Sequence, residues 1–461
     1  MTEATIKWIC DELIPGLPDP LEQGMCMTTG SNVNSNNSPS VGGLRTMKIL
    51  YSIGIYVYGV FIFIASLFNE KARLLRNGQH NAFKLLKEKV DPDGGYVWFH
   101  AASLGEFEQG RPVIEQLKRD QPDVKILLTF FSPSGYEIRK NYAGADIVSY
   151  LPLDIPGNAW YFVNLVKPSK AIFIKYEFWP NYLLALQQAN VPVFSISAIF
   201  RPEQIFFKGY GNWYLKLLRT FSHIFVQDKV SLDLLESHQI ATASVCGDTR
   251  FDRVYDLFKQ AKQLPLIEEF VKNAPEVIVA GSTWPKDEEL LVRYLKLHPD
   301  VKLVLVPHEV HASHISGISG LLDGNFVRYS EATPENVQNT NCLVVDVIGI
   351  LSSIYRYANV AYIGGGFGVG IHNTLEAAVY GIPVVFGPNY QKFREARELI
   401  AVGGAFSISD YVILETQIDR LLKDKQAGKI AGEYVKQNTG ATEKIIKIVN
   451  LTNSLKEGVL V

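Results

Sequence analysis

Glu106 lies in the segment HAASLGE, at a point where a buried strand is expected to give way to a helix. The apolar run GYVWF precedes this segment, and the helical pattern FEQGRPVIEQLKRD follows it. A carboxylate at such a turn can act as a general base toward a substrate hydroxyl, and the positive end of the helix would keep it ionised. The neighbouring Gly105 permits close approach of a ligand or an unusual backbone angle. Taken alone, the position favours the simpler role of a helix-capping acid.

A glycine-rich stretch, GGGFGVGIHNTLEAA, runs from Gly364 to Ala378. Its five glycines lead from a strand into a helix whose first turn is expected to carry His372, Asn373, Thr374 and Glu376. Backbone N–H groups in such a loop bind phosphate, and a glutamate one turn later can accept hydrogen bonds from ribose hydroxyls. The spacing fits neither the dinucleotide nor the Walker fingerprint. We therefore interpret the stretch as a nucleotide-sugar site, with a structural glycine turn as the alternative.

Other segments bear on phosphate and metal binding. AGSTWPKDEE repeats the strand, small-residue turn and helix, and it offers the hydroxyls of Ser282 and Thr283 to a phosphate. VPHEVHASH, residues 306–314, lacks the HExxH spacing that places two zinc ligands on one helix face. Asp91 and Asp93 lie in the segment VDPDGG, where turn chemistry explains them better than a metal does. We expect no metal and no other cofactor.

The elements that must position these residues alternate along the chain. Near-continuous apolar runs such as VKILLTFF, KAIFIKY and VKLVLVPHE are separated by stretches of helical period, a pattern typical of parallel sheets covered on both faces. Two sets of this kind predict an α/β protein with two Rossmann-like domains facing across a cleft, at residues 71–260 and 261–461. Ligands in such sheets bind at the carboxyl ends of the strands.

Composition narrows the function classes. The chain has 461 residues, 47 % hydrophobic and 20 % charged, and its formal net charge is only −2. This is a packed globular protein whose bulk charge does not attract nucleic acid, so no nucleic-acid partner is expected. The four cysteines form no CxxC pair, which favours a reducing cytoplasm.

The N-terminal region has two unlike parts. Residues 1–46 end in a polar, breaker-rich stretch and are interpreted as a disordered extension. Residues 47–70 contain the twenty uncharged residues Ile49 to Phe68, enough to span a hydrocarbon core of about 30 Å. Lysines and arginines follow, which places the large C-terminal part in the cytoplasm. The segment is thus predicted to be a membrane anchor helix that either spans the bilayer or lies at its surface; a core helix is the alternative.

The chain from residue 47 onward resembles the 3-deoxy-D-manno-octulosonic acid (Kdo) transferases of lipopolysaccharide synthesis, which have the GT-B glycosyltransferase fold. The family segment HAaSvGE carries the catalytic base, and its match to HAASLGE implies this role for Glu106. The family's ETELWPN appears as KYEFWPN, which places its acidic residue at Glu177. GNlKfD appears as GDTRFD, so Arg250 replaces a lysine with a planar fork. Ser103 and Gly105 would line the acceptor side.

The donor-side resemblance is similarly dense. GGHNpLEpA appears as GIHNTLEAA, PRHPER becomes PHEVH without its arginine, and GEL becomes GIL. These departures indicate a divergent branch rather than a different reaction. The implied contacts to the donor nucleotide sugar are Ser282, Thr283, Pro307, His308, Gly349, Ile350, Leu351, Asn373, Thr374, Leu375 and Glu376.

The resemblance implies that the chain is an enzyme that transfers Kdo from CMP-Kdo to a lipid A precursor. Glu106 would deprotonate the 6'-hydroxyl of the distal glucosamine, which attacks the anomeric carbon with inversion and releases CMP. The enzyme would be anchored through its N-terminus at the cytoplasmic face of the inner membrane. Another GT-B enzyme, such as a UDP-sugar transferase or a UDP-GlcNAc epimerase, is the main alternative. A non-catalytic membrane-tethered binder is the other.

Overall fold

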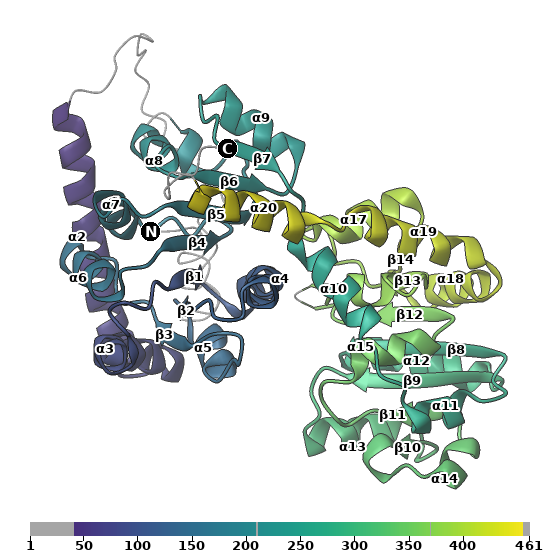
Figure 1. The fold of residues 1–461 in the computed structure, drawn as a ribbon. Coiled ribbons are helices and arrows are strands. Elements are labelled where there is room, and N and C mark those ends of the chain that lie inside the picture. Colours follow the sequence, from purple (N-terminus) through teal and green to yellow (C-terminus); the bar gives the residue numbers. More distant parts are fainter. Residues whose placement is uncertain (1–40, 209–210, 369, 455–461) are drawn as a thin grey trace, which may run out of the picture. The chain divides into compact units, whose positions relative to one another are not determined.

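The computed structural model describes residues 41–208, 211–368 and 370–454, which form two compact units (Figure 1). The first unit extends to Arg250 and resumes at Gly440, and the second comprises Phe251–Thr439. The predicted boundary at 260 therefore differs from the observed division. The C-terminal segment also belongs to the first unit, because Ala441, Ile445 and Val449 recur at helical spacing and are buried against the apolar face of that unit.

The first unit contains a seven-stranded, fully parallel sheet in the order β3-β2-β1-β4-β5-β6-β7. Its strands are β1 (Val97–Ala101), β2 (Ile126–Phe130), β3 (Ile147–Tyr150), β4 (Lys170–Ile174), β5 (Val193–Ala198), β6 (His223–Val226) and β7 (Ala243–Val245). Its helices after β1 are α4 (Leu104–Asp120), α5 (Pro133–Arg139), α6 (Pro156–Val166), α7 (Pro180–Gln188), α8 (Asn212–Leu218), α9 (Lys229–Ser237) and the C-terminal α20 (Ala441–Ser454).

The second unit has its own seven-stranded parallel sheet, in the order β10-β11-β9-β8-β12-β13-β14. The strands are β8 (Glu276–Thr283), β9 (Val301–Pro307), β10 (Val327–Arg328), β11 (Cys342–Val344), β12 (Val360–Ile363), β13 (Val384–Phe386) and β14 (Ala405–Ser407). The chain enters through α10 (Thr249–Lys259), and the other helices are α11 (Pro265–Val271), α12 (Pro285–Leu297), α13 (Ala312–Leu321), α14 (Pro334–Gln338), α15 (Leu351–Ile354), α16 (Leu375–Ala378), α17 (Arg394–Val402), α18 (Tyr411–Lys423) and α19 (Lys425–Gln437).

The prediction of two doubly wound α/β units is confirmed. Strands β1, β2 and β4 are buried at every position, as near-continuous apolar runs require when helices cover both faces of a sheet. Strand order reverses between β1 and β4 in the first sheet and between β8 and β12 in the second. Ligands of doubly wound sheets bind at such reversal points, outside the carboxyl ends of the strands.

Two helices precede the first sheet, α2 (Val41–Ala65) and α3 (Glu70–Lys89). Helix α2 begins at Val41, so residues 41–46 are helical rather than part of the predicted extension, while residues 1–40 lie outside the described residues. The helix ends at Ala65 instead of continuing to 70, because Asn69 accepts the N–H of Ala72 and starts α3.

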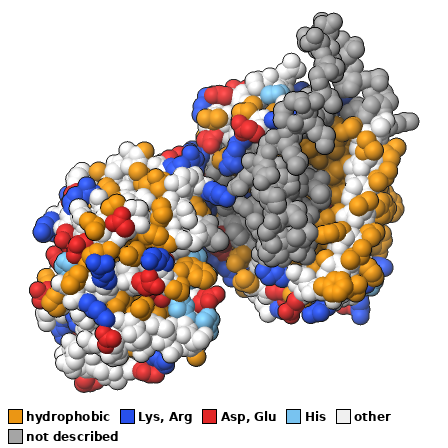
Figure 2. All heavy atoms as spheres, turned by 180° about the vertical axis from the view of Figure 1, so that it is seen from behind, with side chains coloured by type: hydrophobic (Ala, Val, Ile, Leu, Met, Phe, Trp, Pro, Cys, Tyr) orange, Lys and Arg blue, Asp and Glu red, His pale blue; other side chains and the backbone are white. Residues whose placement is uncertain are grey.

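One face of α2 packs on the first unit. Ile55, Tyr58 and Ile62 are buried there, and the hydroxyl of Tyr51 donates to Asp154 at 2.8 Å. The opposite face forms a continuous apolar band (Figure 2), made up of the exposed residues Ile49, Leu50, Ile53, Tyr56, Val57, Val60, Phe61, Phe63 and Ile64. By length and composition, Thr46–Ala65 could cross a membrane.

Candidate functional site

Glu106 lies in the first turn of α4, immediately after β1. Its side chain is buried, and its Oε2 accepts the backbone N–H of Ser103 at 3.0 Å, with the Ser103 hydroxyl at 3.4 Å. Glu106 therefore does cap its helix. Gly105 has ordinary helical geometry rather than an unusual angle, and a Cβ built on it would meet open space. A capping role and a base role do not exclude each other, because both bonds from Ser103 reach the same oxygen.

The charge state of Glu106 departs from the sequence-based expectation. Burial, reinforced by the nearby Glu177, raises the pKa of Glu106 to about 7, while Lys175, His100 and the Ser103 N–H counteract this rise. The helix terminus therefore does not keep the carboxyl fully ionised, because desolvation outweighs it. A pKa close to the working pH is well matched to a general base.

Glu177 follows β4, the strand paired with β1, and so lies at the same reversal point of the sheet. Its side chain is fully buried, and neither carboxyl oxygen has a hydrogen-bond partner among the described residues. Burial raises the pKa of Glu177 to about 8, with Trp179 and Lys175 counteracting. A buried carboxyl without partners is costly for folding and thus typical of a functional position.

A hydrogen-bond network fixes the imidazole ring of His100, which lies near both carboxyls. The indole N–H of Trp179 donates to Nε2 of His100 at 3.0 Å, so the ring proton lies on Nδ1 and is donated to Thr129 Oγ1 at 2.9 Å. Trp98 donates to the same hydroxyl at 2.8 Å. Burial lowers the pKa of His100 to about 3, so the ring is neutral and its 3.8 Å approach to Glu177 is not an ion pair.

Arg250 is held next to α4 by an acidic partner. Its guanidinium binds Asp248 through Nε at 2.9 Å and Nη2 at 2.8 Å. Asp248 also accepts the side-chain amide of Gln109 at 3.1 Å, one helical turn after Glu106. The segment GDTRFD is thereby fixed to the helix that carries the candidate base, and the role of Arg250 in charge stabilisation stays a prediction.

The second unit gathers three aromatic rings at the carboxyl ends of β8, β9 and β12. His308 stacks between Trp284, with centroids 5.0 Å apart, and His372, at 4.4 Å. The Trp284 indole donates to His372 Nε2 at 3.2 Å, and burial lowers the pKa of His372 to about 4. Ser282 has a left-handed φ of 54°, and the buried hydroxyl of Thr283 donates to Glu288 at 3.0 Å. Ser282, Thr283 and His308 are thus brought together.

The glycine-rich loop is tightly packed. A Cβ on Gly364 would lie 2.2 Å from the carbonyl oxygen of Ser282, so close backbone packing demands glycine there. The following helix is shorter than predicted, because α16 begins only at Leu375; His372 and Asn373 precede it and Thr374 is its N-cap. The Asn373 side chain accepts the Leu375 N–H and donates to Glu376 at 3.0 Å. A strong helix-dipole site for phosphate is therefore not formed.

The remaining donor-side residues join this cluster in part. Pro307 ends β9, and the backbone N–H of His308 donates to the Thr283 carbonyl at 3.0 Å. The side chain of Leu351 packs beside Gly281, near the end of β8. Gly349 is exposed, with φ of 92°, and Ile350 is half-buried and packs on the core of the second unit. The buried hydroxyl of Thr374 has no hydrogen-bond partner among the described residues.

The structure does bring the side chains of Glu309, His311 and His314 together, with donor atoms within 4.8 Å of one another. Sequence spacing alone did not indicate this grouping. His311 already pairs with Glu309 at 2.8 Å, and His314 with the buried Glu288 at 3.0 Å.

Several residues of both clusters were not selected from the sequence. His100 and Trp179 belong to the quoted motifs, yet only the fold shows that they hydrogen-bond each other. Lys175 directly follows β4 and has a left-handed φ of 60°, an uncommon conformation for a residue with a Cβ. Asp287 accepts N–H groups from Trp284 and Gly365 and so ties the loops after β8 and β12 together. The sequence feature that could have identified Asp287 is its place in AGSTWPKDEE, in the first turn of the helix that follows the small-residue turn.

Residues 71–253 match the family model of the 3-deoxy-D-manno-octulosonic-acid transferases (kdotransferases). The Kdo transferase of Aquifex aeolicus is 29 % identical over 75 % of this chain and 91 % of its own length. That of Haemophilus influenzae is 26 % identical over 77 % of this chain and 86 % of its own. Over most of its length, this chain is therefore similar to the Kdo transferases. It is therefore an enzyme of a glycosyltransferase family.

The solved structures agree with the two-domain fold. UDP-GlcNAc 2-epimerase from Neisseria meningitidis, bound to UDP-GlcNAc, superimposes with a TM-score of 0.54 at 15 % identity, over 77 % of this chain and 99 % of the epimerase. That likeness shows the GT-B-type fold alone and says nothing of the sugar nucleotide. The predicted fold class is confirmed.

Proposed function

We propose that this enzyme is a Kdo transferase that moves Kdo from CMP-Kdo to the lipid A precursor lipid IVA in lipopolysaccharide core biosynthesis. The observation that carries the proposal is the pair of buried carboxyls, Glu106 and Glu177, at the strand reversal of the unit that matches the Kdo transferase family model. Their raised pKa values, about 7 and 8, suit proton transfer at neutral pH.

On the acceptor side, Glu106 takes the proton as the acceptor hydroxyl oxygen bonds to the anomeric carbon of Kdo, with inversion. The bond from that carbon to the CMP phosphate breaks at the same time, and CMP leaves with the electron pair. The neutral ring of His100 is fixed by Trp179 and Thr129. It forms part of the wall of the site and supplies no charge. Arg250 would stabilise the negative charge that develops on the departing CMP. To do so, its guanidinium must give up part of its pairing with Asp248.

On the donor side, CMP-Kdo would bind at the carboxyl ends of β8, β9 and β12. The ring stack of Trp284, His308 and His372 offers a flat face to the cytosine or ribose, and because the family's arginine is missing, phosphate binding would depend on His308 or on backbone groups. The orphan hydroxyl of Thr374 is a candidate ligand contact, because buried polar groups normally have partners. Glu376 would accept a ribose hydroxyl. CMP leaves with a single phosphate, so this scheme needs no metal.

Helix α2 would place the enzyme at the cytoplasmic face of the inner membrane. Because one face of α2 is docked on the first unit from Tyr51 to Ile62, the exposed band can enter the bilayer surface while the helix stays docked. This geometry favours an interfacial anchor over a spanning one. Tethering raises the concentration of enzyme at an acceptor that stays in the membrane.

The test is transfer from CMP-Kdo, generated in situ, to a tetra-acylated lipid A precursor in detergent, followed by mass spectrometry. We expect a mass gain of one or more Kdo units and competition by CMP rather than by UDP. Competition by UDP, with no Kdo transfer, would favour a UDP-sugar transferase or an epimerase. Complete absence of turnover with any sugar nucleotide would favour a membrane-tethered binder.

Lys175→Met is expected to move the pH dependence of transfer. The cation lowers the pKa of both Glu106 and Glu177, so its removal raises the pKa of the base. The acidic limb of the kcat/KM profile then shifts to higher pH, with little change on the plateau where Glu106 is ionised. A profile measured from pH 5 to 9, at about half-unit steps, checks the shift. An unchanged acidic limb would mean that Lys175 does not act on the base.

A further inference from the structure

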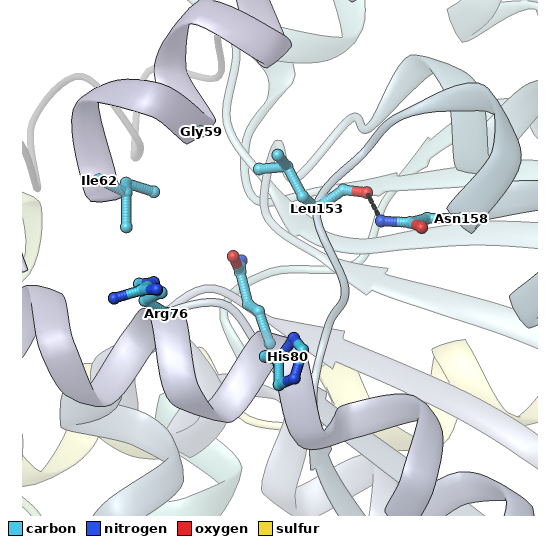
Figure 3. A pocket seen from close by; sticks show the side chains of 7 residues that line it. Gly59, Ile62, Arg76, His80, Leu153 and Asn158 are labelled. Carbon is cyan, nitrogen blue, oxygen red and sulfur yellow. Dashed lines mark hydrogen bonds between the residues drawn. The ribbon is translucent and has the colours of Figure 1, made fainter. Parts of the chain in front are cut away.

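A cavity of about 220 Å³ lies between α2, α3 and the loop that precedes α6. Gly59 and Ile62 of α2 and Leu153 of the loop give it an apolar side (Figure 3). The polar lining comes from Arg76, Gln79 and His80 of α3 and from Asn158. None of these seven lining residues is acidic, so the cavity is suited to an anion rather than a cation. It belongs entirely to the first unit and is not part of either cluster described above.

Two contacts fix the position of the Arg76 guanidinium. Its guanidinium lies 4.2 Å from the centroid of the Phe63 ring, and its Nη1 donates to Ser66 at 3.4 Å. Phe63 belongs to the last turn of α2 and Ser66 follows its end directly, so the cation is fixed against the helix that carries the apolar band. Asn158 donates to the Leu153 carbonyl at 3.0 Å, which fixes the opposite wall. A planar guanidinium with several N–H donors is the side chain that best binds phosphate oxygens.

The cavity adjoins the apolar band of α2. Its lining residues Gly59 and Ile62 alternate along the helix with the exposed Val60, Phe61 and Phe63. Near the other wall, Trp160 is 59 % exposed, and tryptophan is enriched at membrane interfaces. An anion that reaches Arg76 while its apolar part covers this band must be amphiphilic.

We propose that this cavity binds the phosphate headgroup of an anionic phospholipid whose acyl chains lie along the exposed face of α2. Arg76 holds the phosphate, His80 and Gln79 donate further hydrogen bonds, and Ile62 and Leu153 contact the glycerol end of the chains. The lipid would fix the orientation of the enzyme on the bilayer surface. The proposal rests on the proposed membrane placement of α2.

The test is partitioning of the full chain onto vesicles of phosphatidylcholine alone and of phosphatidylcholine with equal parts of phosphatidylglycerol. Arg76→Gln is compared with Lys84→Gln, which removes a cation from an exposed position of the same helix outside the cavity. Loss of one surface charge weakens binding to anionic vesicles about fivefold. We expect about twentyfold or more for Arg76→Gln, because a charge-assisted hydrogen bond is lost as well. Native mass spectrometry should show one retained phospholipid in the unmodified chain and none in Arg76→Gln.

Equal losses in the two variants would overturn the headgroup site and leave general surface charge as the cause. If inorganic phosphate displaced the retained lipid fully, the cavity would be a phosphate site without lipid selectivity, which also contradicts the proposal. Failure of the unmodified chain to bind either vesicle would instead refute the membrane placement. Transfer to detergent-solubilised acceptor should be the same in Arg76→Gln as in the unmodified enzyme, which shows that the variant is folded.

Discussion

Glu106→Gln is expected to lower kcat/KM for Kdo transfer by about 10² or more, the range for loss of a general base. Glutamine is as good as glutamate at the third position of a capped helix, so the amide oxygen can still accept the Ser103 N–H. The substitution therefore keeps the cap and removes only the group that accepts a proton. Steady-state kinetics with CMP-Kdo and the lipid A precursor measure the loss.

The matched control is Glu115→Gln on the same helix. Glu115 pairs with Arg111 at 2.7 Å near the surface, apart from the buried carboxyls of Glu106 and Glu177. Its loss should therefore leave the rate unchanged. Thermal unfolding should show that neither variant is less stable than the unmodified enzyme, since Glu115 is near the surface and Glu106→Gln removes a buried carboxyl with a raised pKa. Transfer that survives Glu106→Gln would reduce Glu106 to a helix cap.

The sequence was sufficient to predict the two sheets and the position of Glu106. Runs such as YVWFHA and VKILLTFF are apolar at nearly every position. This pattern is expected of a strand that is buried on both faces. Glu177 was assigned only through the resemblance of KYEFWPN to the family segment. What remained open was the strand order, on which the adjacency of β1 and β4 depends.

Other features depend on tertiary contacts that no local pattern encodes. The pKa of Glu106 follows from burial against a second carboxyl, which overrides the helix terminus that the sequence suggested. The tautomer of His100 is set by Trp179, 79 positions away. The return of α20 to the first unit likewise follows from packing, because Ala441, Ile445 and Val449 are buried against the core of that unit.

Glu177→Gln is expected to make the protein more stable at alkaline pH while lowering its activity. The pKa of Glu177 rises from an ordinary value near 4.5 to about 8 in the folded chain because burial of the carboxyl outweighs the lowering effects of Trp179 and Lys175. At acidic pH, below 4.5, both folded and unfolded chains hold this proton and the shift has no effect on stability. Between about 4.5 and 8 the unfolded chain releases the proton while the folded chain keeps it, so folding stability falls as pH rises.

An amide at position 177 does not titrate, so the gain over the unmodified enzyme should grow with pH. From the size of the shift, the difference between pH 5 and pH 8 is on the order of 2–3 kcal/mol. Denaturant unfolding of both proteins at the two pH values measures it. Glu203→Gln, an exposed carboxyl in the same unit, is the control and should show no such growth. A gain for Glu177→Gln that is the same at both pH values would mean that the pKa of Glu177 is not raised in the folded enzyme.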